Sequence, residues 1–318
     1  MLITRRTFFR SAVAPLALSL GGRSDTLAAP LSARPLRARP LSAQVSNDDL
    51  AGFRAELLKL VNTERMIAGV SALASDDLAS EVASRHALDM ATAQFLSHWG
   101  SDGRKPYQRY AAAGGFHYVT ENVSSADNLA TLDAKYIRHS LVEMHIRMHD
   151  ERPPNDGHRQ TILAPDHTHV GFGVAIVERR LRLVELYVGK YVEIEPFQRQ
   201  AKPKTNVQIK GKLLGSKHEF AYAEIFYEPL PKRAEIDWLR VGRPYRLPDE
   251  HVVLRPKLPE RAYYVDGAVG KIDVDRKWFR IPVELYKSEP GIYTVIILLK
   301  KAGSREKFRV TNICIQAE

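Results

Sequence analysis

The chain has 318 residues, a formal net charge of +10 and a single cysteine, Cys314, so no disulfide can form within it. Its length is sufficient for two ordinary domains, and 44% hydrophobic with 26% charged residues is typical of a globular protein. No basic stripe with interleaved aromatic residues occurs, so a nucleic-acid partner is not expected. The surplus of positive charge suits anionic wall polymers or lipid headgroups.

Residues 1–28 are predicted to be an export signal. Residues 4–10, Thr-Arg-Arg-Thr-Phe-Phe-Arg, resemble the twin-arginine motif, and the apolar stretch of residues 11–22 is too short to span a bilayer. A disordered basic tail is the alternative. We therefore expect a protein exported to the periplasm or the outside, with no transmembrane span in the mature chain. Loss of the four arginines and one aspartate of residues 1–28, a net +3, would leave a charge of +7.

A first domain is predicted over residues 47–195, after a proline-rich linker at residues 29–46. It begins with a helix whose apolar residues share one face and follow Asn47-Asp48-Asp49, which suit a helix N-terminus. A second helix is expected to start near Ser75, a good N-cap. A short helix over residues 106–113 follows.

The rest of this domain contains a strand, a long helix and a hairpin. Residues 118–124 predict the strand, and residues 127–151 predict a helix that Pro153-Pro154 ends. Residues 169–177 and 181–192 are apolar strands with a tight turn between them, most simply a hairpin. Helices around a small antiparallel sheet predict an α+β fold with three layers.

A second domain is predicted over residues 205–318, after a short linker at residues 196–204. Alternating runs with turn residues between them indicate an all-β sandwich of seven or eight strands. The clearest predicted strands are residues 207–210, 222–228, 278–285, 292–300 and 308–315. No catalytic constellation occurs in this domain.

Four polar residues of the first domain are candidates for a functional site: His98, Glu121, Glu151 and His158. Imidazole nitrogen and carboxylate oxygen are ligands that suit a divalent cation such as zinc. The same groups can instead share protons in a polar cleft, or form a hydrogen-bonded cluster with a purely structural role. The four are far apart in sequence, so only the fold could bring them together.

The order of several short motifs resembles the CAP superfamily, the cysteine-rich secretory, antigen and pathogenesis-related proteins. The motifs are Asn62-Thr63-Glu64-Arg65, the second-helix residues Leu78, Ala79, Ala83, His86, Ala87 and Met90, then His98, Thr120-Glu121-Asn122-Val123, Gly157-His158-Arg159 and Val170-Gly171-Phe172-Gly173-Val174. The resemblance covers residues 50–193 and does not extend to the C-terminal half. The resemblance implies an α-β-α sandwich for these residues. The all-β sandwich that follows them is predicted from the strand pattern alone.

The resemblance also implies a cleft lined by two histidines and two acidic residues, which in some members binds zinc or another divalent ion. His98, Glu121 and His158 match by position. Glu151 is the choice for the fourth residue, with Glu143 as the alternative. The family has an aromatic residue three positions before this acidic residue, and Met148 stands there instead. His145 and His149 flank the fourth position, either on the surface or as residues that orient the ligands.

Three functions are therefore considered. The first is an exported binding protein whose cleft holds a divalent metal, a lipid or a glycan and whose β-sandwich docks on a cell-surface polymer or partner. The second is a metal-dependent hydrolase of peptide, cell-wall or ester bonds with Glu121 or Glu151 as general base. The third is a scaffold in which the cleft has no function. The sequence leaves the ligand and the oligomeric state open.

Overall fold

The structure, a computed structural model, describes residues 45–318. The predicted signal peptide and residues 29–44 of the predicted linker lie outside the described residues. Among the helices of residues 45–318, none combines the length and the hydrophobicity that crossing a membrane requires.

The first domain is built on a four-stranded sheet in the order β1-β3-β4-β2. Its strands are β1 (Ala74–Ser75), β2 (Tyr118–Ala126), β3 (His169–Val177) and β4 (Arg180–Gly189). β3 and β4 form the predicted hairpin, β2 pairs antiparallel with β4, and only β1 runs parallel to its neighbour. The nearly continuous burial of the residues of β3 and β4 fits a sheet that is covered on both faces.

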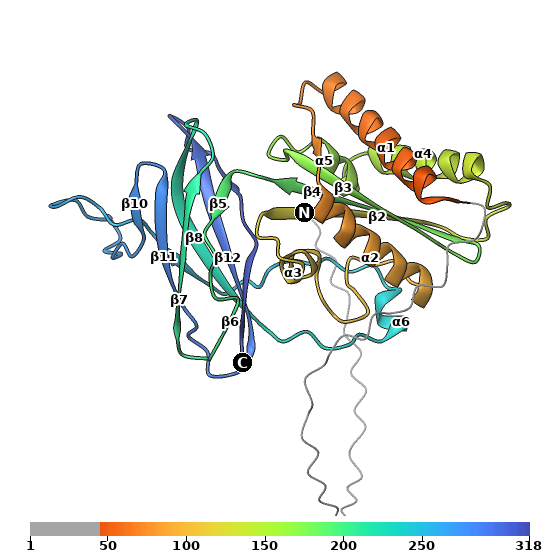
Figure 1. The fold of residues 1–318 in the computed structure, drawn as a ribbon. Coiled ribbons are helices and arrows are strands. Elements are labelled where there is room, and N and C mark those ends of the chain that lie inside the picture. Colours follow the sequence, from red (N-terminus) through yellow and green to blue (C-terminus); the bar gives the residue numbers. More distant parts are fainter. Residues whose placement is uncertain (1–44) are drawn as a thin grey trace, which may run out of the picture. The chain divides into compact units, whose positions relative to one another are not determined.

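Helices cover the two faces of this sheet and make three layers (Figure 1). One core lies between the sheet and the helices α1 (Asn47–Ile67), α4 (Ala134–His149) and α5 (Gly157–Leu163). The other lies between the sheet and the helices α2 (Asp77–Ala93) and α3 (Pro106–Ala112). A Cβ atom on Gly171 or Gly173 would come within 2.2 Å or 2.1 Å of the α2 backbone, so these glycines permit the close approach of α2 to β3. The predicted three-layer α+β fold is confirmed.

Two facing sheets form the C-terminal part of the chain. The first has the order β10-β11-β7-β5 and the second β6-β14-β12-β8-β9, with β13 paired to β12. Their bounds are β5 (Val192–Ile194), β6 (Gln200–Ala201), β7 (Asn206–Leu213), β8 (His218–Pro229), β9 (His251–Leu254), β10 (Asp273–Asp275), β11 (Trp278–Glu284), β12 (Gly291–Lys301), β13 (Lys307–Arg309) and β14 (Ile313–Ala317). Alternate residues of both sheets, such as Ile209, Ile281 and Ile297, meet in one core, as the predicted sandwich requires.

Several predicted element bounds differ from the structure. The helix expected over residues 127–151 begins only at Ala134, because Asp133 caps it by accepting from Tyr136 N at 2.8 Å. The strand expected over residues 181–192 ends at Gly189, and Val192 already starts β5 in the sandwich. The strand expected over residues 308–315 is divided into β13 and β14.

The helix N-caps also differ from the expectation. Ser46 caps α1 with Asp49 as its capping-box partner, and Asp76, one residue after the predicted Ser75, caps α2. α5 was not predicted from the sequence.

The segment between β8 and β9, residues 230–250, is hereafter the crossing segment. It contains the short helix α6 (Ile236–Leu239) and contacts the first domain along much of its length. Ala234 N donates to Ser101 O at 3.0 Å, and Leu239 is buried in the α2–α3 core. Trp238 packs edge-on against Trp99, with ring centroids 5.4 Å apart. The chain therefore returns to the first domain after it has entered the sandwich.

Candidate functional site

The first half of the candidate site is the pair of His98 and Glu121. His98 lies in the loop after α2, and Glu121 lies on β2 with its side chain 1% exposed. His98 Nδ1 donates to Glu121 Oε1 at 3.0 Å, and Arg109 Nη2 of α3 donates to Oε2 at 2.6 Å. Burial opposes ionisation of Glu121, but the guanidinium of Arg109 and the imidazoles of His86 and His98 together outweigh it and lower the pKa of Glu121 to about 2. Glu121 is therefore a fixed, ionised carboxylate.

The crossing segment covers this half of the site. The ring of Tyr245 lies 4.8 Å from the ring of His98, centroid to centroid, and its hydroxyl accepts from Glu121 N at 3.1 Å. On the other side, the buried ring of His86 donates through Nε2 to Ser97 O at 2.8 Å. Burial lowers the pKa of His86 to about 3, so this ring is neutral. The His98 side chain keeps 22% exposure.

The second half of the candidate site is the pair of Glu151 and His158 at the start of α5. Glu151 Oε2 accepts from His158 N at 2.9 Å, and Oε1 accepts from His158 Nδ1 at 2.5 Å. A carboxylate at a helix N-terminus satisfies a backbone N–H that has no partner inside the helix. One glutamate thus fixes both the helix start and the ring of His158, whose side chain is 32% exposed.

Glu143, the alternative to Glu151, lies on the exposed side of α4. Its carboxylate pairs with His139 Nε2 at 3.2 Å, one turn away on the same helix. Of the two alternatives, it is Glu151 that contacts a predicted histidine.

A buried ionic cluster, not predicted from the sequence, lies on the same face of the sheet as His158. His145 Nδ1 contacts Glu185 Oε1 at 2.6 Å, and its Nε2 contacts Glu64 Oε2 at 2.7 Å. Because both partners are carboxylates, both ring nitrogens donate, and the ring is an imidazolium. Burial opposes this charge, but Glu185 and Glu64 outweigh it and raise the pKa of His145 to about 10. Tyr187 donates to the second oxygen of Glu185 at 2.8 Å.

Asn122 connects this cluster to the second half of the site. Its Nδ2 donates to His158 O at 3.2 Å and lies 3.4 Å from Glu185 Oε2. Glu121 and Asn122 are neighbours on a strand, so their side chains point to opposite faces of the sheet. Accordingly Glu121 contacts residues of the α2–α3 side, whereas Asn122 contacts residues of the α4–α5 side.

The structure therefore joins the four predicted residues as two pairs and not as one group. His98 pairs with Glu121 and His158 with Glu151, and the neighbours of the two pairs lie on the two faces of β2. Across residues 45–318, no three or more His, Cys, Asp or Glu side chains are placed to hold one metal ion. The arrangement does not fit a shared ion, so metal binding stays a prediction.

Comparisons with known proteins agree with the motif order. Residues 58–191, less than half of the chain, match the model of the CAP family, described as the cysteine-rich secretory protein family. All four candidate residues lie within this range. A comparison with curated protein sequences gives no match.

Solved structures give partial likenesses. An extracellular protein of Bacillus anthracis that contains an SCP domain is 19% identical, with a TM-score of 0.34; the match covers 44% of this chain and 41% of that one. An outer surface protein of Borrelia burgdorferi is 17% identical, with a TM-score of 0.35, over 45% and 92% of the two chains. The CAP domain of enterococcal PrgA is 17% identical, with a TM-score of 0.35, over 46% and 63%. The family model and the order of the motifs together identify residues 58–191 as a CAP domain of the cysteine-rich secretory protein family.

Proposed function

We propose that the protein is an exported binding protein. Its CAP domain takes a small ligand, a lipid or a glycan, at the imidazoles of His98 and His158, and its β-sandwich docks the domain on a cell surface. The observation that carries this proposal is that the rings of His98 and His158 are held and exposed in the same way. Each has Nδ1 held by a glutamate, each is partly exposed, and neither Nε2 makes a hydrogen bond to any residue in the range 45–318.

This arrangement suits recognition of hydroxyl groups. A carboxylate that accepts from Nδ1–H fixes the tautomer of a neutral ring, so Nε2 carries the lone pair and accepts a hydrogen bond. In the protonated ring Nε2 carries a hydrogen and donates, so an anionic headgroup would accept a hydrogen bond from it. Specificity would then come from the walls around each ring.

A ligand titration tests the proposal. Side-chain NMR signals of the histidines are followed while soluble oligosaccharides and short-chain phospholipids are added to the wild type, His98→Ala and His158→Ala. His139→Ala is the matched control, because His139 is an exposed histidine of α4 paired with Glu143. We expect at least one ligand whose affinity falls tenfold or more in a site variant and not in the control. A ligand that binds the double variant His98→Ala/His158→Ala as tightly as the wild type would overturn the assignment of these rings.

Zinc binding is tested separately. Each pair offers one imidazole and one carboxylate, one ligand fewer than even a catalytic zinc site with three protein ligands. If zinc binds, the two-pair geometry predicts that His98→Ala leaves binding near His158 unchanged. A calorimetric titration in which either substitution abolishes all zinc binding would instead demonstrate a shared site.

The alternative, a hydrolase with a glutamate base, is favoured by one observation. The partly exposed dyad of Glu151 and His158 could accept a proton from water through Nε2. Glu121 is a poorer candidate base, because its pKa of about 2 and its pairing with Arg109 keep it ionised and occupied. Turnover of peptide, ester or cell-wall substrates that disappears in Glu151→Gln would support this alternative.

A further inference from the structure

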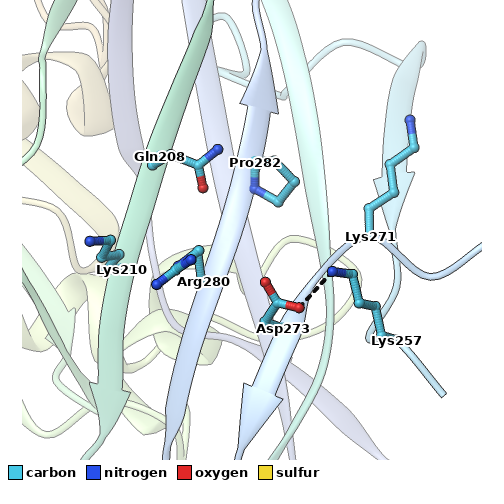
Figure 2. Close-up of a pocket in the computed structure, with 7 residues that line it drawn as sticks. All are labelled: Gln208, Lys210, Lys257, Lys271, Asp273, Arg280 and Pro282. Atoms are coloured by element: carbon cyan, nitrogen blue, oxygen red, sulfur yellow. Dashed lines mark ion pairs between the residues drawn. The ribbon is translucent and has the colours of Figure 1, made fainter. Parts of the chain in front are cut away.

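A cationic hollow of about 420 Å³ lies on the β-sandwich, on the outer face of the sheet β10-β11-β7-β5 (Figure 2). Its charged lining consists of four cations and one carboxylate: Lys210, Lys257, Lys271, Arg280 and Asp273. Lys257 and Asp273 form an ion pair at 2.7 Å, which Figure 2 marks. The remaining cations make no ion pair with any carboxylate of the described residues.

Two of these cations oppose each other in the sheet. Lys210 of β7 and Arg280 of β11 are directly paired in the register of the two strands, and both are exposed. Like charges at opposed positions destabilise a sheet. Asp273 of β10 lies opposite Arg280 on its other side and offsets part of this repulsion, whereas Lys210 has no carboxylate partner among the described residues. An external anion in the hollow would remove the remaining repulsion, so the hollow points to a ligand of negative charge.

A loop with solvent-exposed apolar side chains begins and ends at the same hollow. Residues 257–271 leave and re-enter the sandwich side by side, since Lys257 N donates to Ile272 O at 2.7 Å and Lys271 N donates to Arg255 O at 2.9 Å. Figure 1 shows the loop extending from the sheets beside β10. Three large apolar side chains on it are exposed: Tyr263 by 83%, Val265 by 100% and Val269 by 80%.

We infer that this loop and the hollow at its base dock the protein on an anionic lipid bilayer. Apolar side chains flanked by cations are the arrangement of peripheral membrane segments, in which the apolar groups enter the acyl boundary and the cations meet phosphate headgroups. A soluble anionic polymer would explain the cations but not the exposed valines. An apolar protein partner would explain the valines but not the opposed cations. The inference rests on the docking role proposed for the β-sandwich.

Vesicle sedimentation of the full chain tests the inference. Vesicles of phosphatidylglycerol with phosphatidylcholine are compared with phosphatidylcholine alone, which measures the charge-independent background. We expect binding to the anionic vesicles that weakens as salt rises. Lys210→Gln/Arg280→Gln should weaken it about 25-fold, from a factor of roughly five for each cation near the surface. The triple variant Tyr263→Ser/Val265→Ser/Val269→Ser should weaken it about tenfold or more and keep its salt dependence.

Matched controls distinguish docking through this surface from an effect of the protein's net charge. Lys59→Gln/Lys135→Gln removes the same charge from exposed positions of α1 and α4 and should bind as the wild type. Equal losses in this control and in Lys210→Gln/Arg280→Gln would overturn the inference, as would wild-type binding by the loop variant. Binding to soluble polyphosphate but not to vesicles would make the partner a polymer and refute a lipid surface. Vesicle binding retained in His98→Ala/His158→Ala would show docking to be independent of the CAP ligand.

Discussion

Replacement of Glu228 by glutamine should destabilise the whole described structure, because this carboxylate neutralises a buried cation between the CAP domain and the sandwich. Glu228, in β8, pairs with Lys105 Nζ and accepts from Tyr107 OH at 2.6 Å. Lys105 is also buried, and its ammonium group donates to Arg246 O at 2.7 Å. It lies over the rings of Trp99 and Tyr107, at 5.1 Å and 5.7 Å from their centroids.

The magnitude follows from what remains after the substitution. A buried charge that loses its partner costs about 3–5 kcal/mol. The Arg246 carbonyl and the two rings would retain part of the stabilisation, since a cation–π contact contributes about 0.5–2 kcal/mol. We therefore expect Glu228→Gln to cost about 2–4 kcal/mol, and the double variant Lys105→Met/Glu228→Gln to cost about 1–2 kcal/mol, because no buried charge is then left. Against a total stability of about 5–15 kcal/mol, either change is easily measured.

Urea unfolding followed by circular dichroism gives the four free energies of a double-mutant cycle. The coupling energy between Lys105 and Glu228 should be about 2 kcal/mol or more. A coupling energy below about 0.5 kcal/mol is the value of a solvated surface pair. That result would refute the reasoning, since it would mean that water reaches both charges.

Three further predictions concern His145, Tyr245 and the predicted export signal. His145→Gln should remove a pH dependence of the free energy of unfolding. Because the pKa of His145 is raised from 6.5 to about 10, the contribution of the charged ring to folding stability is complete below pH 6.5 and is lost as pH rises to 10. The difference in urea midpoint between wild type and variant should shrink over that interval, and a constant difference would contradict the assignment. Tyr245→Ala should expose His98 and speed its modification by diethylpyrocarbonate several-fold, as measured by mass spectrometry, while Tyr245→Phe should not. Arg5→Lys/Arg6→Lys should retain the protein inside the cell, which fractionation and immunoblotting would detect; unchanged export would rule out the twin-arginine route.

Much of the fold could be predicted from the sequence because its elements carry strong local patterns. Apolar alternation marked β7, β8, β11 and β12, and the bounds of β11 agree within one residue. The wrong boundary between β4 and β5 depends on tertiary pairing. Nothing local distinguishes Val192 from the end of β4, since only its pairing with Leu213 of β7 places it in the sandwich.

The site was predicted in part for a similar reason. The sequence placed His98, Glu121, Glu151 and His158 in one group. In the structure His98 contacts Glu121 and His158 contacts Glu151, and these partners follow from tertiary contacts that no local pattern shows. One signal for the ionic cluster was present in the sequence: Glu185 is the one acidic residue of β4 and has apolar residues on both sides. Tyr245 had no such signal, because it approaches His98 from a segment more than a hundred residues away.

The pairing of β2 has a consequence for attempts to isolate the CAP domain. β2 is the outermost strand of its sheet, and the chain between β13 and β14 lies along the start of its free side. Tyr118 N donates to Val310 O at 3.0 Å, and Val119 N donates to Asn312 Oδ1 at 2.8 Å. A protein truncated at residue 195 would leave these amides without partners and present a bare template for strand addition. Such a fragment should aggregate edge to edge even where its helices and sheet still form.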